Sequence, residues 1–171
     1  MSQGDAFAPG DALTNVEILY VDDEGHRRDT MRKMLTNLAA RRVQLAESGS
    51  EALKVVMGTP CTVLIAEHRM KAMDGIELVR ELRSARNYPR ALIPVLLLGD
   101  AVGTDIIKAA LAAGANQFLI KPMTPAKLYE RISWVLNDNR PFVVKDGRYV
   151  IKPLKMKLPD GATKSDLTAQ Q

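Results

Sequence analysis

The sequence predicts an α/β fold in which five parallel strands alternate with five helices. Between Val16 and Leu136, each short apolar run of strand length is followed by a segment with helical apolar spacing. Two of these runs, Thr62–Ala66 and Ile93–Leu98, are apolar throughout, as is typical of strands covered by helices on both faces. Strands and helices that alternate in this way form a parallel sheet between two helical layers.

The expected elements follow one another in regular order. The strands are expected at Glu17–Val21, Val43–Ala46, Thr62–Ala66, Ile93–Leu98 and Gln117–Ile120. The helices are expected at Arg27–Ala39, Gly49–Met57, Ile76–Ser84, Asp105–Ala113 and Pro125–Leu136. Right-handed crossovers between the strands then favour a flavodoxin-like (βα)5 doubly wound parallel sheet with the strand order 2-1-3-4-5.

Single residues support three of the helix ends. Ser48 precedes the second helix and is a suitable N-terminal cap, because its hydroxyl can accept a hydrogen bond from a free backbone N–H. Pro125 is tolerated in the first turn of the last helix. Gly114 can adopt the left-handed conformation that commonly ends a helix, here the fourth.

The chain is expected to divide into three segments. Residues 1–15 have neither the basic start nor the apolar run of a signal peptide, and we expect a flexible leader. Residues 16–137 form the predicted α/β domain. Residues 138–171 form a short C-terminal extension, which is too short for a winged-helix DNA-binding domain and has no helix-turn-helix pattern.

Within the extension, Asp146-Gly147 predicts a tight turn between two strands, so that residues 142–151 form a hairpin. An isolated hairpin is marginal in water and needs a surface to pack on. We expect that surface to be the last helix, near Trp134. After about Leu158 the chain has few apolar residues, and we expect disorder there.

Composition places few limits on function. The formal net charge of the 171 residues is +4, and residues 141–171 contribute six Lys or Arg against three Asp, so the extension is basic. Cys61 is the only cysteine, which excludes an internal disulfide and fits a reducing cytoplasm. The apolar runs are too short to span a membrane. We found no P-loop, dinucleotide, GxSxG or zinc-ligand pattern.

Acidic and basic residues follow the strands at one edge of the predicted sheet. Asp22 and Asp23 follow the first strand, Glu67 the third, and Lys121 the fifth. A doubly wound sheet carries its functional groups at this carboxyl-terminal edge. Clustered carboxylates suit a hard divalent ion such as Mg²⁺, and a lysine beside them can pair with a carboxylate or a phosphoryl group.

Four segments of the sequence resemble the CheY-like receiver domain of bacterial response regulators. They read ILYVDDE at Ile18–Glu24, RMKAMDG at Arg69–Gly75, IPVLLL at Ile93–Leu98 and GANQFLIKP at Gly114–Pro122. They have the order and spacing of that family over nearly all of residues 16–136. The resemblance implies a role in two-component or phosphorelay signal transduction, and we expect a signalling module and not an enzyme.

The resemblance assigns roles to the residues at the strand ends. In that family an acidic pair helps to bind Mg²⁺, and an aspartate after the third strand accepts a phosphoryl group. A Ser or Thr and a lysine contact that group, and an aromatic side chain changes rotamer. By resemblance Asp22 and Asp23 are the acidic pair, which with Glu67 could hold Mg²⁺; Lys121 is the lysine and Phe118 the aromatic switch position.

Two of the matching positions depart from the family pattern. The phosphoacceptor position holds Glu67, and the hydroxyl position holds Gly99; the proline usual after Met70 is replaced by Lys71. Glutamate is one methylene longer than aspartate and reaches toward the phosphoryl position, while glycine has no hydroxyl to hold that group. We therefore interpret the chain as a stand-alone, degenerate receiver, with Glu67 paired to Lys121 and Phe118 static.

Three functions are compatible with the sequence. In the first, the receiver binds a kinase, a phosphotransfer protein or another signalling protein through Asp105–Leu136, the face that receivers commonly use. In the second, Glu67 still accepts a phosphoryl group. In the third, the extension binds an anion such as a nucleotide second messenger or RNA through its basic and aromatic residues. Those residues are Arg140, Phe142, Lys145, Arg148, Tyr149, Lys152, Lys155 and Lys157.

The remaining reactive side chains have ordinary explanations. We expect His26 and His68 to be surface residues, since neither has a second histidine at metal-ligand spacing. Cys61 precedes a buried strand and is expected to be a small core residue.

Overall fold

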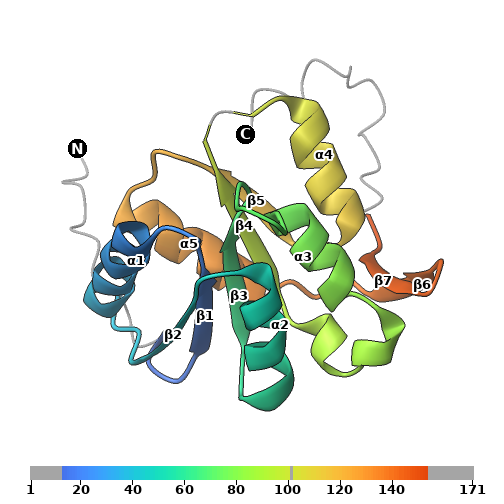
Figure 1. The fold of residues 1–171 in the computed structure, drawn as a ribbon, viewed down its shortest axis with the longest axis horizontal. Coiled ribbons are helices and arrows are strands. Elements are labelled where there is room, and N and C mark those ends of the chain that lie inside the picture. Colours follow the sequence, from blue (N-terminus) through green and yellow to red (C-terminus); the bar gives the residue numbers. More distant parts are fainter. Residues whose placement is uncertain (1–12, 101, 154–171) are drawn as a thin grey trace, which may run out of the picture.

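A five-stranded parallel sheet forms the centre of the computed structural model, which describes residues 13–100 and 102–153 (Figure 1). The strands are β1 (Glu17–Val21), β2 (Arg42–Ala46), β3 (Val63–Glu67), β4 (Val95–Gly99) and β5 (Gln117–Ile120). Their order across the sheet is β2-β1-β3-β4-β5, and every neighbouring pair is parallel. The predicted fold class and strand order are confirmed.

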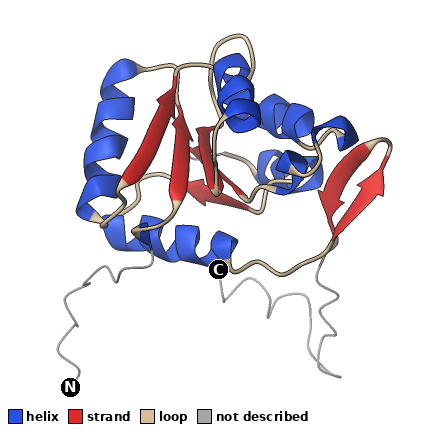
Figure 2. Ribbon diagram, turned by 90° about the horizontal axis from the view of Figure 1, so that it is seen from below, coloured by secondary structure: helices blue, strands red, loops and turns tan. Residues whose placement is uncertain are grey.

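Helices cover both faces of this sheet. They are α1 (Gly25–Asn37), α2 (Gly49–Gly58), α3 (Gly75–Leu82), α4 (Thr104–Ala113) and α5 (Pro125–Leu136), with two short 3-10 helices, η2 (Ala85–Asn87) and η3 (Arg90–Leu92), before β4. One layer holds α1 and α5, and the other holds α2, α3 and α4 (Figures 1 and 2). None of the helices in the described ranges is long and apolar enough to cross a membrane.

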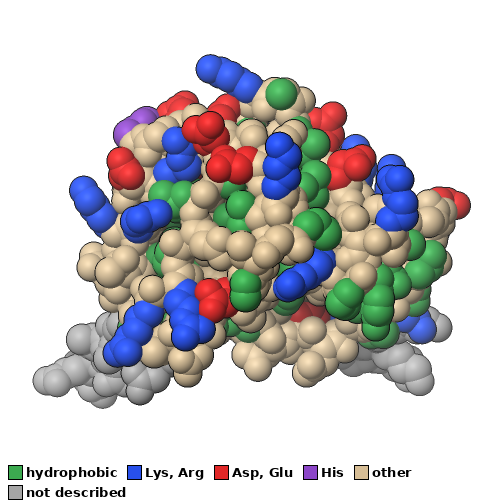
Figure 3. Space-filling view, turned by 60° about the horizontal axis from the view of Figure 1, so that its bottom comes forward, with side chains coloured by type: hydrophobic (Ala, Val, Ile, Leu, Met, Phe, Trp, Pro, Cys, Tyr) green, Lys and Arg blue, Asp and Glu red, His purple; other side chains and the backbone are tan. Residues whose placement is uncertain are grey.

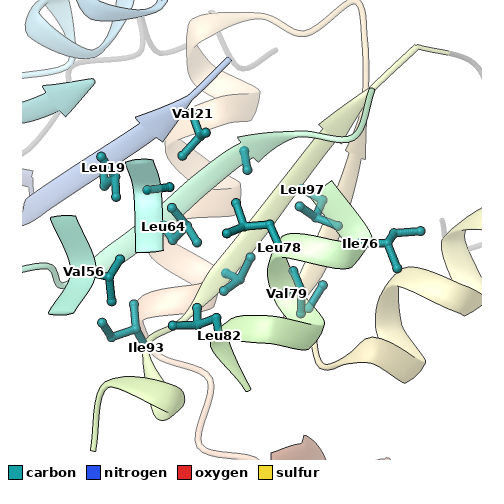
Figure 4. Packing of buried hydrophobic residues seen from close by; sticks show 14 of the residues in the cluster. Leu19, Val21, Val56, Leu64, Ile76, Leu78, Val79, Leu82, Ile93 and Leu97 are labelled. Atoms are coloured by element: carbon teal, nitrogen blue, oxygen red, sulfur yellow. The ribbon is translucent and has the colours of Figure 1, made fainter. Parts of the chain in front are cut away.

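Alternate residues of each strand enter opposite cores. In β1, Leu19 and Val21 belong to the core under α2, α3 and α4, with Leu64 and Leu97 beside them (Figure 4). Tyr20 points to the other core, under α1 and α5. All five residues of β3 and all five of β4 are buried, which explains why both strands are apolar almost throughout.

The predicted helix ends agree with the structure at three positions. The Ser48 hydroxyl oxygen accepts a hydrogen bond from the Glu51 N–H at 3.1 Å. Gly114 ends α4 in the left-handed conformation, with a φ of 109°. Pro125 lies in the first turn of α5, behind a cap by Thr124 that the sequence analysis did not include. Strand β4 begins at Val95 and not at Ile93, because η3 occupies the residues just before.

The domain begins earlier than the sequence suggested. Leu13 is fully buried in the core under α1 and α5, and its carbonyl oxygen accepts a hydrogen bond from the Val16 N–H. The expected flexible leader, residues 1–15, is therefore too long at its C-terminal end. Residues 1–12, and the expected disorder after Leu158, lie outside the described residues.

After α5 the chain forms an antiparallel hairpin of β6 (Phe142–Lys145) and β7 (Arg148–Ile151). The expectation that it packs on α5 is wrong. The hairpin lies against the C-terminal ends of α3 and α4 and is hydrogen-bonded to the segment after α3, where Tyr149 N–H donates to Arg83 and Ala85 N–H donates to Gly147. Figure 3 shows hydrophobic side chains gathered on this side of the molecule.

Arg83 accounts for this position of the hairpin. Its side chain is fully buried and donates hydrogen bonds to the carbonyl oxygens of Ala91, Ile93 and Gly114 at 2.6 to 2.9 Å. The Phe142 ring covers the guanidinium carbon at 4.8 Å. Burial lowers the pKa of Arg83 to about 9, so the group stays charged at neutral pH. The hairpin therefore covers the buried, charged guanidinium group of Arg83.

We predict that Arg83→Ala destabilises the whole domain. The substitution leaves three buried carbonyl oxygens without donors and removes the surface on which Phe142 packs, so the free energy of unfolding should fall by about 3 kcal/mol or more. Urea unfolding followed by far-UV circular dichroism measures the loss. The control is Arg86→Ala, in the exposed part of η2, which should change stability by no more than about 0.5 kcal/mol. Equal stability of the two variants would contradict the role given to Arg83.

Candidate functional site

The polar residues singled out by the sequence meet at the carboxyl-terminal edge of the sheet. Asp22 follows β1, Glu67 and Gly99 are the last residues of β3 and β4, and Lys121 follows β5. Because parallel strands end at the same edge, four segments far apart in the chain supply one site. The expected meeting of Glu67 with Lys121 is present, while Asp22 and Asp23 reach the site with partners that the sequence analysis did not anticipate.

Glu67 and Lys121 form a direct ion pair. The Lys121 Nζ atom lies 3.0 Å from Glu67 Oε2, and the Glu67 side chain is only 5% exposed. Burial raises the pKa of Glu67 above its ordinary value, and the bond to Lys121 offsets part of that rise. The lysine is thus engaged by the carboxylate of this chain.

Tyr20, in β1, contacts both Asp22 and Glu67 through its hydroxyl group. Its hydroxyl oxygen lies 2.8 Å from Asp22 Oδ2 and 3.2 Å from Glu67 Oε1. Burial, followed by the two nearby carboxylates, raises the pKa of Tyr20, so its hydroxyl stays protonated and donates to a carboxylate. The single hydroxyl proton therefore lies between the two deepest acidic groups, with the shorter contact to Asp22.

Arg27, in the first turn of α1, binds Asp22 with two parallel hydrogen bonds. Its Nε and Nη2 atoms lie 2.7 Å from the two carboxylate oxygens of Asp22, which is fully buried. Burial opposes ionisation of Asp22, but donors from Arg27, the Glu24 N–H and Tyr20 together hold its pKa below the ordinary value. Asp22 is therefore an ionised, fully hydrogen-bonded carboxylate.

Asp23 is bound by the loop between β3 and α3. Its Oδ2 atom accepts a hydrogen bond from the Lys71 backbone N–H at 2.8 Å, and its Oδ1 atom lies 3.5 Å from Arg27 Nη2. A proline at position 71 could not make the first of these bonds, because proline has no backbone N–H. The replacement of the usual proline by Lys71 therefore gives Asp23 a hydrogen-bond donor that a proline could not supply.

Phe118 fills the space beside Gly99. A Cβ atom added to Gly99 would lie 2.8 Å from Phe118 Cζ, which is closer than real Cβ atoms come to any neighbour. His68 lies beside both residues, and its ring meets the Phe118 ring edge-on at a centroid distance of 5.8 Å. The aromatic side chain occupies the position where a Ser or Thr side chain would stand.

The acidic groups do not fit a metal ion in this arrangement. Within residues 13–100 and 102–153, no three Asp, Glu, His or Cys side chains are disposed to hold one. The sequence suggested that Asp22, Asp23 and Glu67 could hold Mg²⁺; in the structure each is hydrogen-bonded to a donor of the chain itself. A hard cation needs carboxylate oxygens that can coordinate it directly.

Sequence reasoning did not find Tyr20 or Arg27. A signal existed for Tyr20, because it lies two residues before Asp22 in a strand, and residues two apart share a face. A signal existed for Arg27 as well, since it follows Asp23 by four residues at the start of a helix. Neither spacing could indicate that Arg27 would reach inward to Asp22 and not outward to solvent.

The other reactive residues are placed as follows. His26 is exposed, as expected, but the expectation for His68 is wrong: it is buried against Phe118. Cys61 is buried, its thiol donates to the Val63 carbonyl oxygen, and burial raises its pKa to about 11. Cys61 is therefore a core residue with little thiolate at neutral pH.

These features define a receiver-type α/β domain, and comparisons with known proteins agree. The family model for the response regulator receiver domain matches residues 18–133. Chemotaxis protein CheY1 of Helicobacter pylori is 33% identical over 125 residues, which is 72% of this chain and 99% of that protein. A CheY homolog of Campylobacter jejuni is 33% identical over 122 residues, covering 71% of this chain and 92% of that protein.

A solved structure supports the same assignment. The structure of Vibrio cholerae chemotaxis protein CheY4 matches with a TM-score of 0.64 and 28% identity, over 70% of this chain and 98% of that one. The chain belongs to the response regulator receiver family and is a CheY-like domain of two-component signalling. Receiver domains are in general signalling modules and not enzymes.

We predict that Gly99→Ala forces Phe118 out of its position. The added methyl group overlaps the ring, so the free energy of unfolding should fall by about 1 kcal/mol or more. Thermal unfolding measures the loss for Gly99→Ala, Phe118→Ala and the double variant. The cost of the methyl group should be much smaller when Phe118 is already alanine. Additive losses would show that the two residues do not compete for the same space.

Proposed function

We propose that this chain is a degenerate receiver that binds a protein partner without an aspartyl-phosphate cycle. The observation that carries the proposal is the buried ion pair of Glu67 with Lys121. In a working receiver that lysine contacts the phosphoryl group; here the glutamate side chain itself supplies the anion. The cytoplasmic location expected from the sequence stays a prediction.

The space around Gly99 supports the same proposal. A switch requires that a group on β4 move toward the phosphoryl oxygens and that an aromatic side chain take the vacated volume. Gly99 has no hydroxyl to move, and Phe118 already fills the adjoining space. Both parts of the switch are thus fixed, so we assign the domain one conformation and a constitutive binding surface.

The proposed binding surface is the face from Asp105 to Leu136, formed by α4, β5 and α5. The edge strand of the sheet, β5, lies in it, and Leu111 on α4 and Ile120 on β5 are each 41% exposed. Both apolar side chains lie on the face that receivers commonly use for partners, so we place the interface there. The hairpin docks on α3 and α4, and beside it Arg140 lies over the Trp134 ring of α5 at 5.2 Å, so the extension borders this face.

We predict that the protein takes no stable phosphoryl label. Acetyl phosphate or beryllofluoride with Mg²⁺ should leave its intact mass and its ¹H–¹⁵N spectrum unchanged, because Glu67 is already engaged by Lys121 and Tyr20. A receiver with aspartate at the acceptor position, treated in parallel, is the positive control. A stoichiometric, base-labile adduct on Glu67, with shifts at Phe118 and Lys121, would overturn the proposal and favour a working phosphoacceptor.

We also predict that charges on the α4-β5-α5 face abolish partner binding. The Leu111→Glu and Ile120→Glu variants should retain less partner protein from a lysate of the source cell than the wild type does. This result should be the same with or without a phosphoryl donor. Met57→Glu is the matched control, since Met57 has the same 41% exposure but lies on α2, outside this face. Retention that is unaffected by the first two variants, or equally reduced by the third, would show that the partner binds elsewhere.

Anion binding by the extension is the second candidate. Lys145 and Arg148 line a groove of about 260 Å³ with Arg80 of α3, and no ion pair engages these three residues within the part of the chain that the structure describes. The other basic residues do not converge on it. Arg140 is paired with Asp138, Lys152 lines a separate groove beside Trp134, and Lys155 and Lys157 lie outside the described residues. Binding of an anion that weakens with added salt would favour this candidate.

A further inference from the structure

Arg27 brings a positive charge to the acidic edge of the site. Its guanidinium lies 2.7 Å from both oxygens of Asp22, 3.5 Å from Asp23 Oδ1 and 3.1 Å from Glu24 Oε1. One side chain thus contacts the acidic pair and the acid that follows it, and its single positive charge offsets part of their negative charge. In receivers of the ordinary type that neutralisation is expected of Mg²⁺.

We propose that the Arg27 guanidinium takes the place of the divalent cation, so that this receiver holds its acidic site together without a metal. The inference deepens the proposed function and rests on it, since it concerns the same site. Its physical basis is that the carboxylates must be neutralised by some cation, and a planar guanidinium matches a carboxylate with two parallel hydrogen bonds.

Most of the oxygens that a metal would need are engaged, and the remaining Asp23 Oδ1 faces Arg27 Nη2 at 3.5 Å. Both oxygens of Asp22 accept from Arg27, one oxygen of Asp23 accepts from the Lys71 N–H, and Glu67 Oε2 accepts from Lys121. Mg²⁺ binds proteins through one or two carboxylates in a nearly ideal octahedron completed by water. To enter, it would have to break the bidentate pair and approach two cations, Arg27 and Lys121, at short range.

Arg27 is held in place by more than one contact. Its side chain is two-thirds covered, and its three acidic partners are the consecutive residues Asp22, Asp23 and Glu24 that connect β1 to α1. Hydrogen bonding to Asp22 is the largest of the effects that raise its pKa, so the group is always charged. A long surface arginine would have none of these constraints.

The neighbouring arginine provides a matched control. Arg28 lies beside Arg27 in α1, and its Nη1 atom donates to the backbone carbonyl of Asp22 at 2.6 Å. It contacts none of the carboxylates of Asp22, Asp23 or Glu67; its ion pair is with Glu47. Removal of Arg28 therefore changes the net charge by the same amount but leaves the acidic oxygens occupied.

The test is a titration of the full chain with Mn²⁺, a paramagnetic substitute for Mg²⁺, followed by electron paramagnetic resonance of the free ion and by broadening of ¹H–¹⁵N signals. We expect no saturable site in the wild type or in Arg28→Ala. In Arg27→Ala and Arg27→Gln we expect a saturable site that is at least about tenfold tighter than the weakest binding the titration can detect, with broadening centred on Asp22 and Asp23. Two Arg27 variants are used so that one can fail to fold without ending the test.

Either of two results would overturn the inference. One is a wild type that binds Mn²⁺ at Asp22 and Asp23 as tightly as the Arg27 variants; the other is a pair of folded Arg27 variants that gain no affinity. The titration contains no phosphoryl donor, so its failure leaves the proposed function standing. A phosphoryl adduct on Glu67 would instead contradict the proposed function. It would not by itself decide whether Arg27 replaces the metal ion.

Discussion

A buried carboxylate needs a cation or several hydrogen-bond donors within reach, and the carboxyl-terminal edge of this sheet is arranged around that need. Glu67 ends a strand with every residue buried, and its charge is met by Lys121 and by the Tyr20 hydroxyl. Because Lys121 follows β5 and Tyr20 lies in β1, one carboxylate joins three strands. Its longer side chain reaches the lysine directly, so the charges of these two groups are balanced within the protein.

The individual departures from the family pattern act together at this edge. Glu67 engages the lysine, Gly99 leaves room that Phe118 fills, and Lys71 supplies an N–H that a proline would lack. Each one alone would weaken a receiver, while together they leave the described carboxylates hydrogen-bonded and the space beside Gly99 filled. Because these changes support one another, we interpret the site as a stable alternative arrangement and not as a damaged receiver site.

The sequence alone predicted the strand order of the sheet and, within the site, the pairing of Glu67 with Lys121. Strand order follows from five apolar runs and right-handed crossovers, and the meeting of Glu67 with Lys121 follows from parallel strand ends. The position of the hairpin could not be predicted, because arginine is usually a surface residue and the carbonyl acceptors of Arg83 lie in two segments far from each other in the chain. Burial of His68 likewise depends on the ring of Phe118, a contact across two strands.

The ring of Phe118 over Gly99 has a consequence for how such a protein can carry information. When no covalent change alters the shape of a binding surface, occupancy of that surface follows mass action alone, set by the amounts of the two proteins and their dissociation constant. Control then passes from the chemistry of the domain to its synthesis, its breakdown and rivals for the same partner. Such a chain reports how much of it a cell has made.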